Sequence, residues 1–240
     1  MVEQAICFRN VEKSFADKRV LSGVDFSVDK GEFFAFVGAN GQGKTTLIKA
    51  MLDFIELDGG EIEIFGCSHR LTKARQPLAY LPERFNPPHF LSGRDFIKYM
   101  MKLHQHPYDE EQLLNLFQQL DLDSRVLSQS VRTFSKGMTQ KLGLSGCLLS
   151  GKPLLILDEP MSGLDPKARV LFKRHLMRLK EAGTSLFFST HLLPDVEELC
   201  DRMAIIHQGR VHFIGSPKGC RDLYPAESLE ASFIRCIESG

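Results

Sequence analysis

The chain has 240 residues, with 30 lysine and arginine side chains against 30 aspartate and glutamate side chains, and 43% of its residues are apolar. This length suggests one large domain or two small ones, and the apolar content argues against a disordered chain. The net charge of zero and the isoelectric point near 7.1 argue against a protein that is held on nucleic acid or acidic lipid by bulk charge. A local basic groove stays compatible with these numbers.

The sequence shows no segment of the kind that crosses a membrane or directs secretion. The most apolar stretches, such as Phe33 to Val37, are far shorter than the roughly 18 residues of a spanning helix. The first four residues are acidic and polar and lack the basic-then-apolar order of a secretory signal. Six cysteines are scattered without a CxxC pair, so we interpret them as small buried residues in a reducing cytosol: Cys7, Cys67, Cys147, Cys200, Cys220 and Cys236.

Apolar runs alternate with helical patterns, which is typical of an α/β fold with a mostly parallel sheet. The runs Phe33–Val37, Leu154–Leu157 and Leu186–Phe188 have no polar alternation, as expected of strands that are covered on both faces. The segment Glu61–Phe65 does alternate and follows the turn Asp58-Gly59-Gly60. It therefore predicts a half-exposed antiparallel strand.

The pattern becomes wholly helical between about residues 84 and 151, which predicts an inserted helical subdomain. Ser92 with Asp95 predicts the start of one helix. The apolar positions of this helix and of the next one are Phe96, Ile97, Met100 and Leu103, then Leu113, Leu116, Phe117 and Leu120. Further on, Asp165-Pro166 predicts the start of a helix that Gly183 ends. We expect one domain over residues 1–240, with a short C-terminal tail at about 217–240.

A glycine-rich segment, Gly38-Ala39-Asn40-Gly41-Gln42-Gly43-Lys44-Thr45, follows the first buried strand and opens a helix near Thr45. A strand, this loop and a helix are together typical of a phosphate-binding loop. Glycines let backbone N–H groups turn toward phosphate oxygens, and the start of the helix adds a partial positive charge. We expect Lys44 to reach the β- and γ-phosphates and the Thr45 hydroxyl to hold Mg²⁺.

Two carboxylates, Asp158 and Glu159, end the strand that begins at Leu154, at the sheet edge where open parallel sheets bind ligands. Asp158 is a candidate for the Mg²⁺ shell, and Glu159 for the group that polarises the attacking water. His191 follows another strand and is a candidate for the γ-phosphate and for holding Glu159. Polar residues at strand ends are commonly solvated surface residues. The presence of the phosphate-binding loop in the same chain favours the catalytic and metal-binding roles.

These residues closely resemble the nucleotide-binding subunits of ATP-binding-cassette transporters, over nearly the whole chain. The segment Phe134-Ser135-Lys136-Gly137-Met138 looks like the signature motif of that family, which acts on the γ-phosphate bound by the opposite subunit. The loop Ser162-Gly163-Leu164-Asp165 resembles the D-loop, through which each subunit senses the other site; a simple helix cap by Asp165 is compatible with that role. Phe15 sits where the family stacks an aromatic ring on adenine, although alone it would be a core residue.

The resemblance implies an ATP-binding-cassette fold: a P-loop NTPase core with an antiparallel β subdomain and the inserted helical subdomain. It implies Glu159 and His191 as catalytic residues, Ser135 and Gly137 as contacts across a dimer, and Asp165 in the D-loop. The ATP-binding residues would be Phe15, Gly38, Asn40, Gly41, Gly43, Lys44, Thr45 and Thr46. The residues that hold Mg²⁺ would be Thr45, Asp158 and Glu83.

Two positions depart from the broad family pattern. Glu83, in Tyr80-Leu81-Pro82-Glu83, replaces the usual glutamine; a carboxylate can still ligate Mg²⁺ or its water but adds a negative charge near the γ-phosphate. Lys136 replaces a glycine, and it either offsets phosphate charge or is solvated. Both departures, with Leu229-Glu230 and Phe233 near the C-terminus, resemble the ATPases of ABC-2 type exporters.

The function implied is ATP hydrolysis that powers export through separate transmembrane permease subunits, at the cytoplasmic face of the cell membrane. We expect a homodimer, because every motif is intact, although a heterodimer stays open. The permease would dock on the surface between Glu83 and Met101, where Arg84, Phe85, Pro87, Pro88 and Phe90 offer a notch; an ordinary loop is the alternative. Two other functions stay open: a soluble ATPase for cofactor assembly, and the motor of an importer. His104 and His106 are interpreted as surface residues, since they lack metal-ligand spacing.

Overall fold

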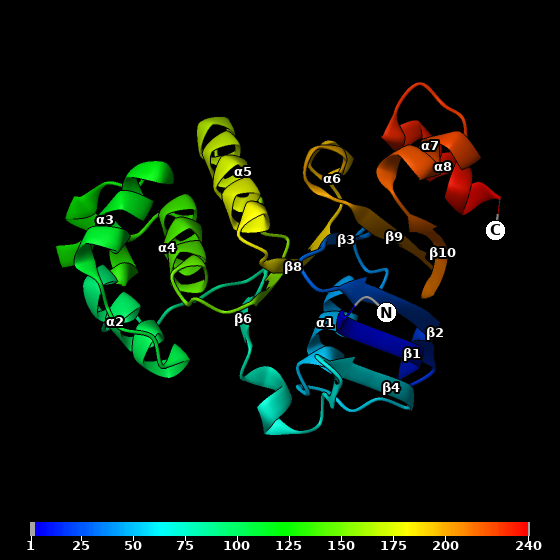
Figure 1. The fold of residues 1–240 in the computed structure, drawn as a ribbon, viewed down its shortest axis with the longest axis horizontal. Helices are drawn as coiled ribbons and strands as arrows, with labels where there is room; N and C mark the ends of the chain where they lie inside the picture. The colour runs from blue at the N-terminus through cyan, green and yellow to red at the C-terminus, as the bar shows by residue number, and fades with distance from the viewer. Residues whose placement is uncertain (1–2, 240) are drawn as a thin grey trace.

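Two β-sheets and a group of helices make up residues 3–239, the part of the chain that the computed structural model describes (Figure 1). The first sheet is antiparallel, with the strand order β2-β1-β4-β5. Its strands are β1 (Gln4–Phe15), β2 (Lys18–Asp29), β4 (Gly59–Ile64) and β5 (Cys67–Ser68). The predicted antiparallel strand is thus confirmed as β4, although it begins at Gly59 and ends before Phe65.

The second sheet has the order β10-β9-β3-β8-β7-β6, and all its neighbouring strands except β10 and β9 run parallel. The bounds are β3 (Phe33–Val37), β6 (Leu78–Leu81), β7 (Leu154–Asp158), β8 (Ser185–Thr190), β9 (Arg202–His207) and β10 (Arg210–Gly215). The three predicted buried strands are confirmed, and every residue of β3, β7 and β8 is buried.

Alternate residues of β3 supply two separate hydrophobic cores. Phe34 and Phe36 face the antiparallel sheet, where the Phe34 ring stacks on Phe26 with centroids 5.1 Å apart. Phe33 faces the opposite layer, which includes α5 (Pro166–Glu181) and α6 (Leu193–Leu199). Because both faces of the strand are covered, its side chains are apolar throughout, and only the strand ends are free to carry polar chemistry.

The helical region packs around its own core, at the end of the molecule away from the antiparallel sheet (Figure 1). It holds α2 (Gly93–His104), α3 (Glu110–Gln119) and α4 (Lys136–Leu148), with the 3₁₀ turns η2 (Ser124–Ser128) and η3 (Val131–Thr133) between α3 and α4. Ser92 begins α2 as predicted, since its Oγ accepts a hydrogen bond from the Asp95 N–H at 3.1 Å.

Two expectations about the helical region were wrong. Residues 84–92 form no helix, because Pro87 and Pro88 lack backbone donors and disfavour helical conformation in the residue before each of them. Leu103 was expected on the buried face of α2, yet it is 58% exposed. It lies on the last turn of α2 and lines a surface groove with Leu78 and Met100.

The C-terminal segment consists of two packed helices, α7 (Pro217–Leu223) and α8 (Leu229–Glu238). Leu229 and Cys236 of α8 are buried, and the helix contacts α6, α7 and β10. The expected tail is therefore an integral part of the core. Within the described residues, no helix is long and apolar enough to cross a membrane.

All six cysteines are free thiols. Cys147, Cys220 and Cys236 are buried, as the sequence predicted. Cys7, Cys67 and Cys200 are only half-buried.

Candidate active site

The glycine-rich loop connects β3 to α1 (Lys44–Met51), as the sequence predicted. Gly43 lies at the start of α1 with φ +105°, and a Cβ there would lie 2.8 Å from the Val20 carbonyl oxygen. No larger residue fits this backbone. The first N–H groups of α1 carry no side-chain cap, which leaves them available to an anion.

Lys44 is buried and its ammonium points back into the loop. Nζ donates to the carbonyl oxygens of Gly38 at 2.6 Å and Ala39 at 3.2 Å, and it lies 3.2 Å from Glu159 Oε1. Asn40 is exposed on the same loop. The loop and the carboxylate strand β7 therefore meet, and Lys44 is the side chain that joins them.

Asp158 ends β7 directly beside Ser189 of β8, its partner in the parallel register. Its Oδ1 accepts a hydrogen bond from the Ser189 hydroxyl, whereas Oδ2 is buried without a partner. Burial raises the pKa of Asp158, and hydrogen bonds from the Ser189 and Thr45 hydroxyls act in the opposite direction. The Glu83 and Glu159 carboxylates raise that pKa further, which places three acidic groups near one another.

Mg²⁺ fits this arrangement. A buried, unpartnered carboxylate oxygen such as Asp158 Oδ2 costs free energy unless a cation or donor satisfies it, and the Thr45 hydroxyl lies near the same carboxylate. Glu83 is exposed, so it can move toward the site or away from it.

Glu159 follows Asp158 in a strained backbone conformation, with φ +49°. Its carboxylate is 9% exposed and has a partner on each side: Lys44 at Oε1, and His191 Nδ1 at 2.9 Å from Oε2. His191 is half-exposed. The expected pairing of His191 with Glu159 is thus present.

Three further residues of the predicted site lie at the surface. The Phe15 ring is 49% exposed at the end of β1, with the Lys13 ammonium 5.4 Å from its centroid. Ser135 begins α4, accepting from the Met138 N–H at 3.2 Å, and Asp165 begins α5, accepting from the Ala168 N–H at 2.9 Å. Phe15 is therefore free to stack on a planar ligand, in contrast to a core residue.

Comparisons with known proteins agree with this geometry. The family model described as ABC transporter matches residues 21–162. The chain belongs to the ABC transporter ATPases.

Among curated proteins, an uncharacterized ABC transporter ATP-binding protein of Bacillus subtilis is 34% identical over 214 residues, which are 88% of this chain and 69% of the relative. A Nod factor export ATP-binding protein of Burkholderia lata is also 34% identical, over 88% of this chain and 71% of its own length. An uncharacterized relative from Synechocystis is matched over only 56% of its length.

Solved structures show the same fold. The ATP-binding subunit of an ABC transporter superposes with a TM-score of 0.85 at 30% identity, covering 97% of this chain and 99% of that one. A dimeric ATP-binding cassette bound to ADP and Pi, in a post-hydrolysis state, gives a TM-score of 0.79 at 20% identity, over 88% and 98% of the two chains. The α/β fold with an antiparallel sheet and inserted helices is therefore confirmed.

In this ABC ATPase, the start of α4 and the loop after β7 contact each other within the subunit. The buried Gln140 amide donates to the Pro160 carbonyl at 3.1 Å, and a Cβ on Gly137 would lie 3.1 Å from the Gly163 carbonyl. The Lys136 side chain lies over Gly163, because its Cε would be 3.1 Å from a Cβ there. The signature segment and the D-loop thus form one unit.

Lys136 and Glu83 line the same cavity of 480 Å³, beside Ser162 of the D-loop. Although its side chain lies over Gly163, Lys136 is exposed to solvent. The two departures from the family pattern therefore bring opposite charges to one cavity.

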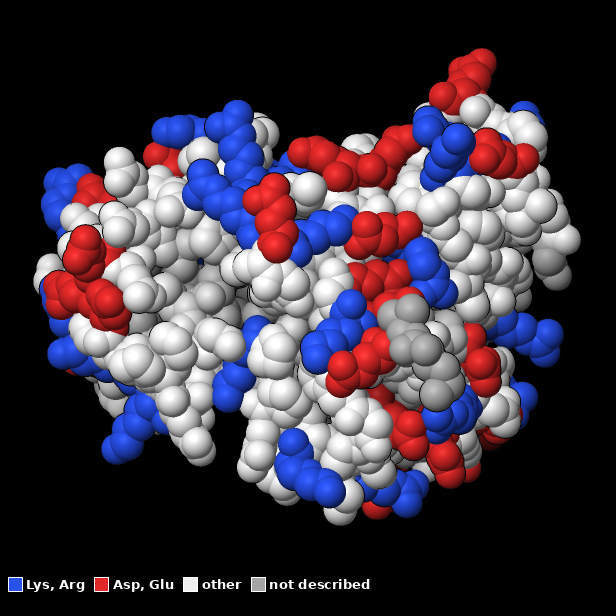
Figure 2. Space-filling view, in the orientation of Figure 1, with Lys and Arg blue, Asp and Glu red and all other residues white. Residues whose placement is uncertain are grey.

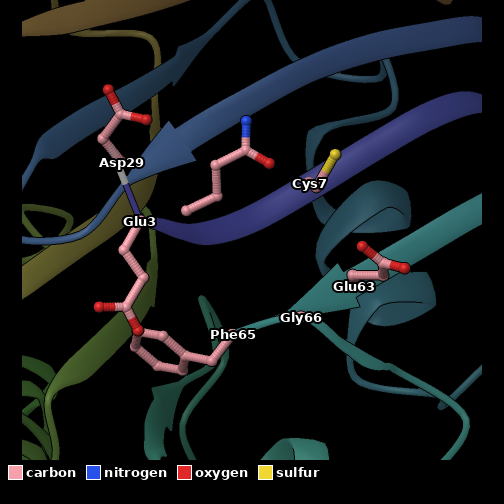
Figure 3. A pocket seen from close by; sticks show the side chains of 7 residues that line it. Glu3, Cys7, Asp29, Glu63, Phe65 and Gly66 are labelled. Carbon is pink, nitrogen blue, oxygen red and sulfur yellow. The ribbon is translucent and has the colours of Figure 1, made fainter. Parts of the chain in front are cut away.

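A cavity of 730 Å³ lies elsewhere, at the end of β1 opposite Phe15. Figure 3 shows the Glu3, Asp29 and Glu63 side chains around it. These carboxylates would repel a phosphate, and Glu3 and Glu63 already pair with Lys30 and Arg9 at 2.9 Å. This cavity is therefore not the nucleotide site of the ABC ATPase.

One residue that belongs to the site was missed in the sequence. Ser189 contacts both Asp158 and the backbone of Glu159. Its signal was a hydroxyl that interrupts the apolar run of β8 at the position that pairs with Asp158.

Proposed function

We propose that the chain is the motor of an exporter: two copies bind two Mg-ATP molecules between them and drive separate transmembrane subunits. The observation that carries this proposal is the separation of two complementary phosphate-binding segments. Figure 1 shows α1, which follows the glycine-rich loop, and α4, which follows the signature segment, apart from each other in one subunit. A second copy is needed to bring a signature segment to an ATP on the glycine-rich loop.

Lys44 and the N–H groups at the start of α1 would hold the phosphates, and Phe15 would stack on the adenine. Asp158, Thr45 and Glu83 would hold Mg²⁺, which supplies charge neutralisation between the β- and γ-phosphates. The ATP-binding set would be completed by Gly38, Asn40, Gly41, Gly43 and Thr46.

Glu159 would accept a proton from the attacking water as general base. His191 would hold that carboxylate and donate to the γ-phosphate. Since Glu159 Oε2 lies 2.9 Å from the imidazole, the base would already be oriented before ATP arrives.

The start of α4 supports the dimer. Ser135 is exposed and Gly137 is half-buried, so the helix end with its free N–H groups faces outward. The D-loop contacts the start of α4 and would lie at the same interface. A homodimer is proposed because one chain carries both halves of a complete site.

The groove between α2 and the core would receive the transmembrane subunit. It has a volume of 500 Å³, lies between α2 and the 3₁₀ turn η1 (Thr72–Arg75), and is lined by Leu78, Met100 and Leu103. Figure 2 shows a hollow in this region. Phe90, in the notch expected from the sequence, is 86% exposed as well; it precedes the start of α2, whereas Met100 and Leu103 lie toward the other end of that helix. The Burkholderia relative is named for Nod factor export, and this similarity favours an exporter.

The test is capture of the partner. A tagged chain, extracted from membranes in mild detergent, should co-purify with a protein of about six membrane spans. Leu103→Asp should abolish this capture, because it places a charge in the groove. Leu114→Asp is the matched control, since Leu114 is an exposed leucine on α3 outside that groove. Capture only from the soluble fraction, or equal capture by both variants, would contradict the proposal.

A further inference from the structure

We propose that Ser189 is a positioning residue for ATP hydrolysis, which sets the orientation of both acidic groups at the end of β7. The inference rests on the roles proposed above for Asp158 in holding Mg²⁺ and for Glu159 as the base. The inference adds to these two residues a third, Ser189, that would contact neither the nucleotide nor the metal.

A single buried hydroxyl joins the two acids. Ser189 is 0% exposed on β8, and the parallel register places it beside Asp158. Its Oγ donates to Asp158 Oδ1 and accepts from the Glu159 backbone N–H at 3.0 Å. A serine hydroxyl has one hydrogen, and a backbone N–H can only donate, so the hydroxyl hydrogen must point to Asp158.

This hydrogen bond decides which oxygen of Asp158 is left for a cation. With Oδ1 held by the hydroxyl, the carboxylate plane is fixed and Oδ2 stays buried without a partner. An outer hydrogen-bond partner of this kind orients a metal ligand without touching the metal. Without the hydroxyl, the carboxylate would lose the hydrogen bond that holds Oδ1.

The same hydroxyl supports the unusual backbone of Glu159. A φ of +49° is strained for a glutamate, and the structure around it must hold it in place. The Glu159 N–H is shared between Ser189 Oγ and the Ser189 carbonyl oxygen, the latter at 3.2 Å. This turn directs the Glu159 carboxylate between Lys44 and His191.

The strand offers a matched control. Ser185 lies on the same strand, is also 0% exposed, and its Oγ accepts from the Gly31 N–H at 2.8 Å. Its hydroxyl therefore supports the opposite end of β8. Ser185→Ala removes the same atom from an equally buried place, so it reproduces any general cost to stability.

The experiment measures Mn²⁺ affinity by electron paramagnetic resonance, in full-length protein saturated with a non-hydrolysable ATP analogue, together with kcat and KM for ATP. Ser189→Ala should weaken Mn²⁺ binding about 10- to 100-fold and lower kcat, with KM changing much less. Ser185→Ala should leave Mn²⁺ binding within about 3-fold of the wild type, because it lies outside the site. Ser189→Thr, which keeps the hydroxyl, and Ser189→Cys, which keeps the size, separate loss of the donor from loss of packing.

Wild-type Mn²⁺ affinity and kcat in a folded Ser189→Ala protein would overturn the inference. Equal losses in Ser185→Ala would also overturn it, because they would show a structural role only. If the wild type with bound analogue took up no Mn²⁺ at all, the proposed metal site itself would be wrong, and the inference would fall with it. If only Ser189→Ala lost Mn²⁺ while the wild type bound it, both proposals would be supported.

Discussion

The Lys44 ammonium lies 3.2 Å from Glu159 Oε1, so the lysine proposed to bind phosphate and the proposed base form a buried pair. Their side chains are only 6% and 9% exposed, and solvent therefore screens the pair weakly. A γ-phosphate in the loop would compete with Glu159 for the same ammonium. ATP binding would thus release the carboxylate from Lys44, while His191 keeps its contact at Oε2.

Glu159→Gln should bind ATP more tightly than the wild type. The substitution removes the charge that competes with phosphate for Lys44, and a hydrogen bond to a charged group contributes about 1.5–3 kcal/mol, so we expect an affinity gain of about 10- to 100-fold. Hydrolysis should stop, because an amide cannot act as general base. A fluorescent nucleotide titration measures the first effect and phosphate release the second. ATP turnover at the wild-type rate would contradict the role of Glu159.

Lys44→Ala should abolish tight ATP binding, with a loss of at least about 10-fold. Lys49→Ala is the matched control, because Lys49 is an exposed lysine in the last turn of the same helix. The same titration distinguishes them. Equal binding by the two variants would show that the loop does not hold the phosphates as proposed.

Glu83→Gln should strengthen ATP binding in the absence of Mg²⁺ and weaken the use of Mg²⁺ in hydrolysis. Without the metal, losing a negative charge near Asp158 should favour ATP, since like charges repel. With the metal, losing a carboxylate should raise the Mg²⁺ concentration for half-maximal hydrolysis several-fold. An ATP titration in EDTA measures the first effect, and a Mg²⁺ titration of ATP hydrolysis measures the second. An unchanged or lower Mg²⁺ requirement in the variant would show that Glu83 does not contribute to the metal site.

Cys147 and Cys220 should resist thiol reagents in the folded protein. Burial raises the pKa of Cys147 to about 12 and that of Cys220 to about 11, and only the thiolate reacts. At pH 8 these thiols stay protonated and enclosed, whereas Cys67 is partly exposed and should be labelled first. Mass spectrometry after a short exposure to iodoacetamide reads out each site, with guanidinium-unfolded protein as control. Rapid native labelling of Cys147 would contradict its burial.

The sequence predicted the central strands because their physical signal is strong. β3, β7 and β8 are covered on both faces, so each contains a run of apolar residues without polar alternation. The glycine-rich loop was equally clear, since Gly43 occupies a backbone conformation that no other residue adopts there. Asp158, Glu159 and His191 were placed together because they end neighbouring parallel strands.

Tertiary contacts decided what the sequence did not show. The helix pattern of α2 includes Leu103, but its side chain is 58% exposed and lines a groove, although Met101 in the same turn is buried. Ser189 was hidden within a buried strand, and only the register between β7 and β8 placed its hydroxyl beside Asp158. The link from Gln140 to Pro160 likewise joins segments that are far apart in sequence until α4 packs beside the loop after β7.

In the proposed function, one ATP site needs two copies of the chain. Light scattering on the Glu159→Gln protein tests this most directly, because the variant should bind ATP without releasing it by hydrolysis. The mass should rise from the 27.1 kDa of one chain to twice that value when ATP and Mg²⁺ are added, and Ser135→Arg in the same background should prevent the change. A mass that stays at 27.1 kDa with saturating ATP would contradict the shared site.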